Sequence, residues 1–216
     1  MDRLLEYVGG HTEELLRQVW EHAAVVGTAI AIATVLGVAL GVTTWDRPWA
    51  RTAAVAATGT FLTIPSFALL GLLIPLLGLG WMPTVVALVL YALLPITRNT
   101  IVGLREVGPA ILEAARGTGM GPLRTLLRIQ LPLAWPLILT GIRVSTQLTV
   151  GIAAIAAYVA GPGLGNEIFD GLSRLGSKNA INQALAGTLG VIILALAFDL
   201  LFFALRRLTT PRGLRV

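Results

Sequence analysis

The stretch EAARGTGMGPLRTLLRIQLP, residues 113–132, is a polar, arginine-rich segment in a chain that is otherwise largely apolar. It predicts two short helices. Good helix formers follow Pro109, and proline suits the first turn of a helix. Gly119 breaks this first helix, Pro122 starts a second one, and the pattern predicts that the second helix ends at Pro132. We therefore expect a helical hairpin with apolar residues on one face and arginines on another.

The composition places this hairpin in a membrane protein. Of 216 residues, 56% are hydrophobic and 12% are charged, and the mean hydropathy is +0.82. These values exclude an ordinary soluble domain. The absence of cysteine excludes disulfides, thiolate metal sites and a cysteine nucleophile. The net charge of +5 is spread along connections between apolar runs, which suits membrane topology and argues against a nucleic-acid partner.

Five apolar runs predict an all-α, polytopic membrane protein with about five transmembrane helices. A helix needs about 20 apolar residues to cross a hydrocarbon core of about 30 Å. Arg143 lies within the fourth run and Asp199 within the fifth. We expect Asp199 to pair with a charge such as Arg206 or to contact water near the inner surface. The five runs are 23–42, 52–79, 83–97, 133–159 and 180–205.

The distribution of basic residues predicts the orientation. With five crossings, twelve of the 16 Lys and Arg residues fall on one side of the membrane and four on the other. The richer side is expected to be cytoplasmic. The N-terminus is then outside, and the C-terminus and residues 113–132 are cytoplasmic. From pattern alone the hairpin is either a docking element for another protein or a surface helix pair whose arginines meet lipid phosphates.

The hairpin also resembles the signature loop of the permease subunits of ABC importers. The motif is Glu-Ala-Ala, three residues, Gly, nine residues, Ile, one residue and Leu-Pro. The resemblance implies the fold of a type I importer permease and a coupling helix that fits a cleft of an ATP-hydrolysing subunit. In this sequence the matching residues are Glu113, Ala114, Ala115, Gly119, Ile129, Leu131 and Pro132.

Three further stretches resemble permeases for glycine betaine, carnitine and choline, namely 63–100, 141–143 and 156–172. The third departs slightly, because Pro162 precedes Gly163-Leu164-Gly165 where the family usually has Gly-Gly-Leu-Gly. The resemblance implies a transmembrane subunit for uptake of quaternary-ammonium osmoprotectants across the inner membrane of a prokaryote. Two other interpretations remain open: a permease for another small solute such as an amino acid, and a membrane anchor or scaffold for a soluble enzyme.

The implied partners are an ABC ATPase subunit, an extracytoplasmic substrate-binding protein, a second permease copy or paralogue, and membrane lipid. We expect no catalytic residue, because a phosphate-binding loop needs lysine where the nearest candidate, 171–179, has Ser177. ATP and magnesium therefore belong to the partner. His11 and His22 are too isolated to be metal ligands.

Along the chain we expect three parts. Residues 1–22 are an N-terminal interfacial helix, since Thr12 is followed by acids in the manner of a helix cap. Residues 23–206 are the transmembrane domain, which includes the cytoplasmic coupling loop 105–132. Residues 207–216 are a basic cytoplasmic tail.

Prolines and glycines suggest a pathway and a docking turn. Pro65 and Pro75 should break the second span and Pro95 the third, and exposed backbone inside a membrane needs protein or water around it. A possible translocation path is therefore lined by Thr63, Pro65, Ser66 and Asn99. Kinking for packing alone is the alternative.

Two groups of glycines have different expected roles. Gly37 and Gly41 should mark close helix packing. The turn that contains Gly161, Gly163 and Gly165 is either a docking site for the binding protein or a plain chain reversal.

Overall fold

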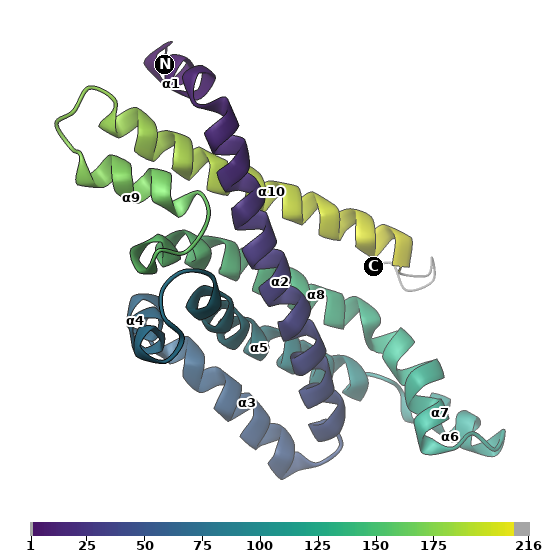
Figure 1. Cartoon of the computed structure of the whole chain (residues 1–216). Coiled ribbons are helices and arrows are strands. Elements are labelled where there is room, and N and C mark those ends of the chain that lie inside the picture. The colour runs from purple at the N-terminus through teal and green to yellow at the C-terminus, as the bar shows by residue number, and fades with distance from the viewer. Residues whose placement is uncertain (1, 210–216) are drawn as a thin grey trace.

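The computed structural model describes residues 2–209, which form helices and contain no strand. Figure 1 shows α2 crossing the molecule, α5 and α8 behind it, and α6 and α7 projecting beyond the other helices. The α-helices are α1 (Asp2–Gly10), α2 (Thr12–Thr44), α3 (Pro48–Thr63), α4 (Ser66–Leu77), α5 (Trp81–Arg105), α6 (Pro109–Gly117), α7 (Pro122–Thr125), α8 (Leu131–Ile155), α9 (Gly165–Ser173) and α10 (Ala180–Thr209).

Four stretches are long and apolar enough to cross a membrane: α2, α5, α10, and the continuous stretch Pro122–Val159 that contains α8. The α3–α4 pair passes the same test as one broken span, with a bend of 96°. The predicted all-α membrane fold with about five crossings is therefore confirmed.

The second span is bent because of one proline. The apolar run 52–79 is broken at Pro65, as expected: the helix stops at Thr63, and Ile64 is extended with φ −78° and ψ 126°. Pro65 disfavours a helical conformation at the residue before it. Tyr91 of α5 donates its hydroxyl to the Ile64 carbonyl at 2.7 Å, so the carbonyl at the bend has a partner. Pro75 and Pro95 lie inside α4 and α5 without ending them.

The core forms where α2 and α8 pack on α5, and small residues allow the backbones to approach closely. A Cβ on Gly37 would lie 2.8 Å from Ile96 Cγ2, and one on Gly41 would lie 2.6 Å from Thr100 Cβ. From α8, a Cβ on Gly141 would lie 2.7 Å from the Pro95 carbonyl oxygen. The prediction that Gly37 and Gly41 mark close helix packing is confirmed.

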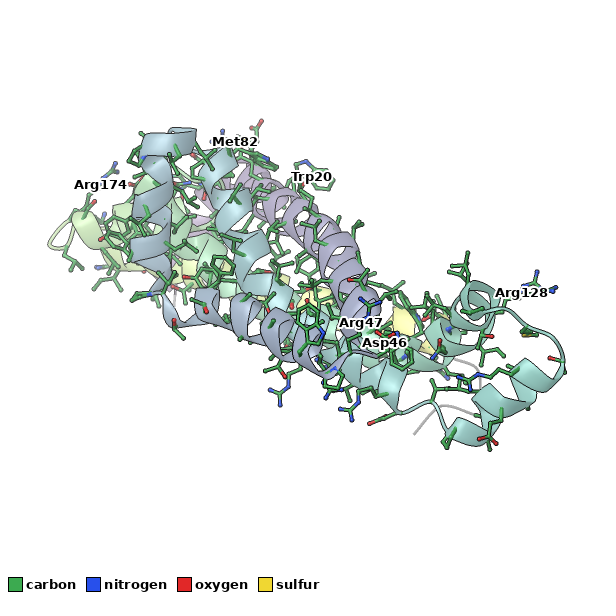
Figure 2. The ribbon with its side chains drawn as sticks, turned by 90° about the horizontal axis from the view of Figure 1, so that it is seen from below. Trp20, Asp46, Arg47, Met82, Arg128 and Arg174 are labelled. Carbon is green, nitrogen blue, oxygen red and sulfur yellow. The ribbon has the colours of Figure 1, made fainter. Side chains whose placement is uncertain are left out.

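The molecule has two ends, named here after the roles that the sequence predicts for them: the coupling end and the outer end. At the coupling end Trp45 and Asp46 line a groove with residues of the coupling loop, and Trp135 Nε1 donates to Thr209 Oγ1 at 2.9 Å. At the outer end the Gly80 amide donates to the Val159 carbonyl at 2.7 Å. Figure 2 shows Arg128 at the coupling end, and Trp20, Met82 and Arg174 at the opposite end.

Three expected boundaries differ from the structure. The N-terminal helix ends at Gly10, and α2 runs from Thr12 without a break, so residues 12–22 extend the first span. At 33 residues and about 1.5 Å per residue, α2 is about 50 Å long, which exceeds the hydrocarbon thickness. At the other terminus α10 continues to Thr209, and the rest of the expected basic tail, 210–216, lies outside the described residues.

Candidate functional site

The coupling loop is a hairpin whose bend is closed by backbone hydrogen bonds. After α6 the chain reverses at Gly119, which has φ +79°. The Gly119 amide donates to the Arg116 carbonyl at 2.9 Å and the Met120 amide to the Ala115 carbonyl at 3.1 Å. This pair of bonds defines a Schellman motif, which places a left-handed residue just after the helix and favours glycine there. The glycine of the signature therefore has a direct structural reason.

The second arm of the hairpin joins the membrane helix without a break. We expected it to end at Leu131-Pro132, but α7 continues through one π-helical segment, Leu126–Gln130, into α8. The Leu131 amide donates to the Leu126 carbonyl. Pro132 falls in the first turn of α8, where a missing amide hydrogen is tolerated. This arm and α8 therefore form one continuous helical segment.

The hairpin presents an apolar surface beside charged residues. Ile111, Leu123 and Leu127 are all exposed. Glu113 and Ala114 are exposed and Ala115 is buried. An exposed apolar patch rimmed by polar residues marks an interaction surface. A shallow groove here is lined by Ala110, Ile111, Ala114, Ala115, Thr118, Met120 and Ile129.

The four predicted path residues do not form one cluster. Thr63, Pro65 and Ser66 surround the bend between α3 and α4. Asn99 lies two turns of α5 beyond Tyr91, the residue that contacts the bend, which corresponds to about 12 Å along the helix. Thr63 Oγ1 donates to the Thr60 carbonyl at 2.7 Å, and Asn99 Nδ2 to the Pro95 carbonyl at 2.8 Å. A path through these residues stays a prediction.

The glycine-rich turn at the outer end is packed inside the protein. Gly161, Gly163 and Gly165 are all buried. A Cβ on Gly163 would lie 2.7 Å from His22 Cβ, so the turn lies against α2. These glycines therefore shape the turn and do not themselves form an accessible docking surface. Docking at this turn stays a prediction, and it would have to use exposed neighbours such as Tyr158.

Gly165→Ala should be strongly destabilising, because its Cβ would lie 2.0 Å from the Ala154 carbonyl oxygen of α8. We expect a loss of about 3 kcal/mol or more in stability, since backbone has to move to admit the methyl group. Gly151→Ala in α8 is the matched control, because nothing lies within 4 Å of its Cβ. Thermal unfolding of the two purified variants checks this. Equal unfolding temperatures would contradict the close contact.

An ion pair joins α8 to α10. Arg143 Nε donates to Asp199 Oδ1 at 2.6 Å and Arg143 Nη2 to Asp199 Oδ2 at 2.7 Å, and Gln147 Nε2 donates to Oδ1 at 2.7 Å. We expected Asp199 to pair with a charge such as Arg206 or to contact water, and in the structure its carboxylate pairs with Arg143. The signal was available in the sequence, because one arginine and one aspartate stand alone in two apolar runs and each needs an opposite charge.

A second polar group, at the outer end, was not predicted. Glu167 of α9 is 5% exposed, and it accepts from the Tyr7 hydroxyl at 2.7 Å and from Gln18 Nε2 at 3.0 Å. Burial and the neighbouring Glu167 carboxylate raise the pKa of Tyr7, which keeps its phenol protonated as a donor. These contacts fasten α1 and α2 to α9. Sequence offered one weak signal, a single carboxylate inside the glycine-rich turn region.

In the part of the chain that the structure describes, no group of three or more His, Asp or Glu side chains is arranged to hold a metal ion. His22 is buried, and its Nε2 lies 3.1 Å from the Val150 carbonyl oxygen. Its position is explained by packing between α2 and α8.

The helices and apolar spans, with an exposed loop between two of the spans, define a multi-span α-helical membrane protein. Residues 33–212 match the family described as "binding-protein-dependent transport system inner membrane component", and the chain belongs to this family. The resemblance to ABC-importer permeases is thereby confirmed.

Two similar proteins align along nearly the whole chain. The osmoprotectant import permease protein OsmW of Salmonella typhimurium (strain LT2) is 38% identical over 216 residues, covering 98% of this chain and 99% of OsmW. The choline transport system permease protein OpuBB of Bacillus subtilis (strain 168) is 35% identical over 215 residues, covering 100% of this chain and 97% of OpuBB.

Solved structures share the fold. A chain of the MetNI methionine ABC transporter in an inward-facing conformation superposes with a TM-score of 0.80 at 24% identity, covering 94% of this chain and 99% of that chain. A chain of an amino acid ABC transporter gives a TM-score of 0.70 at 15% identity, covering 94% and 95%. At these identities the likeness establishes the fold of an importer permease and nothing about the solute.

Proposed function

We propose that this chain is the transmembrane subunit of an ATP-driven importer for quaternary-ammonium osmoprotectants such as glycine betaine, choline and carnitine. The names of the relatives OsmW and OpuBB support this substrate class. The chain lies in the inner membrane with its N-terminus outside and its C-terminus in the cytoplasm. Twelve of its 16 Lys and Arg residues then fall on the cytoplasmic side.

The observation that carries the proposal is the exposed hairpin over 109–130. It projects beyond the other helices (Figure 1) and presents large apolar side chains to its surroundings. Its second arm continues into α8 through Leu126–Gln130. A separate ATPase subunit that holds this hairpin in a cleft can therefore move α8 when it binds and hydrolyses ATP with magnesium.

The proposed function also implies the other subunits of the transporter and its pathway. One chain with five crossings forms half of a pathway, so two permease chains, identical or paralogous, pair across it. A substrate-binding protein delivers the solute at the outer end, and the path opens to each side in turn. The Thr63, Pro65 and Ser66 bend and Asn99 contribute to that path.

Uptake into vesicles tests the proposal. Vesicles that hold this chain, its ATPase and its binding protein should accumulate at least one of radiolabelled glycine betaine, choline and carnitine, and only when ATP is supplied to the ATPase side. Vesicles without the permease are the control. Accumulation of none of the three, with the ATPase still bound, would contradict the substrate class. ATP turnover that is indifferent to solute and binding protein would instead indicate an anchor.

A further inference from the structure

A polar pocket of about 580 Å³ lies at the outer end, between the N-terminal helices and α9. Four carboxylates and two guanidinium groups face it, so its wall carries net negative charge. Arg17 is held within the wall by Glu14 at 3.2 Å and by Glu21 at 3.6 Å. The charged residues that line the pocket are Glu14, Arg17, Glu21, Glu167, Asp170 and Arg174.

One buried group in this wall lacks a partner. Gln18 is 5% exposed, and its Nε2 donates to Glu167 Oε1 at 3.0 Å. Its carbonyl oxygen Oε1 has no hydrogen-bond partner among the described residues. Exchanging the oxygen and nitrogen of the Gln18 side-chain amide would lose the hydrogen bond to Glu167. An ionised carboxylate only accepts hydrogen bonds, so the NH₂ group must face it. The wall of the pocket therefore contains a buried acceptor that needs a donor.

The charge of the pocket, its volume and the unpartnered acceptor indicate which chemical group it binds. Among residues 2–209 no three carboxylates or histidines are arranged to hold a metal ion. The volume far exceeds the roughly 30 Å³ share of one water molecule. An arginine or lysine side chain fits, because it brings positive charge to a negative wall and several N–H donors to the Gln18 carbonyl and the carboxylates.

We propose that this pocket receives a basic side chain of the extracytoplasmic substrate-binding protein when that protein docks. The proposal rests on the proposed function, which supplies the binding protein and places this end outside. It also assigns the docking contact to α1, α2 and α9, next to the glycine-rich turn, through side chains that are accessible. Asp170 and Glu14 are exposed at the pocket, whereas the three glycines of the turn are buried.

Charge variants of Asp170 test the proposal. Permease and ATPase are placed in lipid nanodiscs, and the affinity of the solute-loaded binding protein of the same system is measured at several salt concentrations. Asp170→Asn should weaken binding about threefold and Asp170→Lys about tenfold or more, with the larger loss at low salt. Glu13→Lys is the matched control, because Glu13 is exposed one residue from Glu14 but does not line the pocket. It should bind within twofold of wild type, about the scatter of exposed charge changes.

The outcomes separate the two proposals. Equal affinity of Asp170→Lys and wild type, or an equal loss with Glu13→Lys, would overturn the docking pocket. Retention of the ATPase by each variant shows that it is folded, since the coupling loop lies at the opposite end. Failure of the wild-type complex to bind the binding protein at all would contradict the proposed function, and the docking pocket with it.

Discussion

Glu113→Ala is expected to lower ATP-driven uptake about 30-fold while leaving membrane insertion intact. Glu113 is exposed on α6, beside the apolar groove of the hairpin. In the proposed complex this surface is enclosed by the ATPase, where truncation of a charged contact costs about 2 kcal/mol or more. A loss of 2 kcal/mol in docking corresponds to about a 30-fold change in affinity.

The measurement is co-purification of the ATPase with the permease, followed by uptake into vesicles. Glu106→Ala is the matched control, because Glu106 is an exposed carboxylate at the end of α5 and lies outside the signature. It should retain both the ATPase and uptake. Co-purification of Glu113→Ala at wild-type yield together with normal uptake would contradict the role of the hairpin.

The hairpin could be predicted from the sequence because its chemistry is local. Proline at the start of each arm and a glycine with positive φ between them determine two short helices. What could not be predicted was the passage of the second arm into α8. Leu131-Pro132 is a stop signal in isolation, but the π-helical segment before it places Pro132 in a first turn, where the helix continues.

In the membrane spans, too, local features could be predicted from the sequence, whereas features that depend on tertiary contacts could not. Hydropathy located the helices among residues 2–209 that are long and apolar enough to cross a membrane, since a helix satisfies its own backbone there. It could not tell which of three prolines would break a span. Pro65 does so where Tyr91 from another helix offers a hydroxyl to the freed carbonyl, while Pro75 and Pro95 remain inside helices.

Contacts between residues far apart in the chain were the hardest feature to predict from the sequence. Glu167 lies far along the chain from Tyr7 and Gln18, and no local sequence pattern predicts the hydrogen bonds between them. For the same reason the sequence left a docking site and a plain chain reversal open for the glycine-rich turn and did not indicate its burial. Gly161 is buried against Ala156 and Thr84, Gly163 against α2 and Gly165 against α8.

The second prediction with a large expected effect concerns the ion pair between α8 and α10. Asp199→Asn should lower the yield of folded permease several-fold, because the Arg143 guanidinium then loses the opposite charge and one of its two acceptor oxygens. An unpaired charge within a membrane-spanning helix has neither water nor an opposite charge to stabilise it. Arg143→Gln should have a similar effect, since it leaves the Asp199 carboxylate with Gln147 as its remaining described hydrogen-bond donor.

The double variant Arg143→Leu with Asp199→Leu distinguishes pairing from a specific need for charge. Removing both partners leaves no unpaired charge, and replacing an ion pair by apolar side chains is often neutral or stabilising. Most of the folded yield lost in either single variant should therefore return, as measured by size-exclusion chromatography of detergent-solubilised protein. Single variants at wild-type yield would show that the pair does not stabilise the fold. A double variant that folds but no longer transports would place the pair in the moving parts of the pathway, where α8 receives the displacement of the coupling loop.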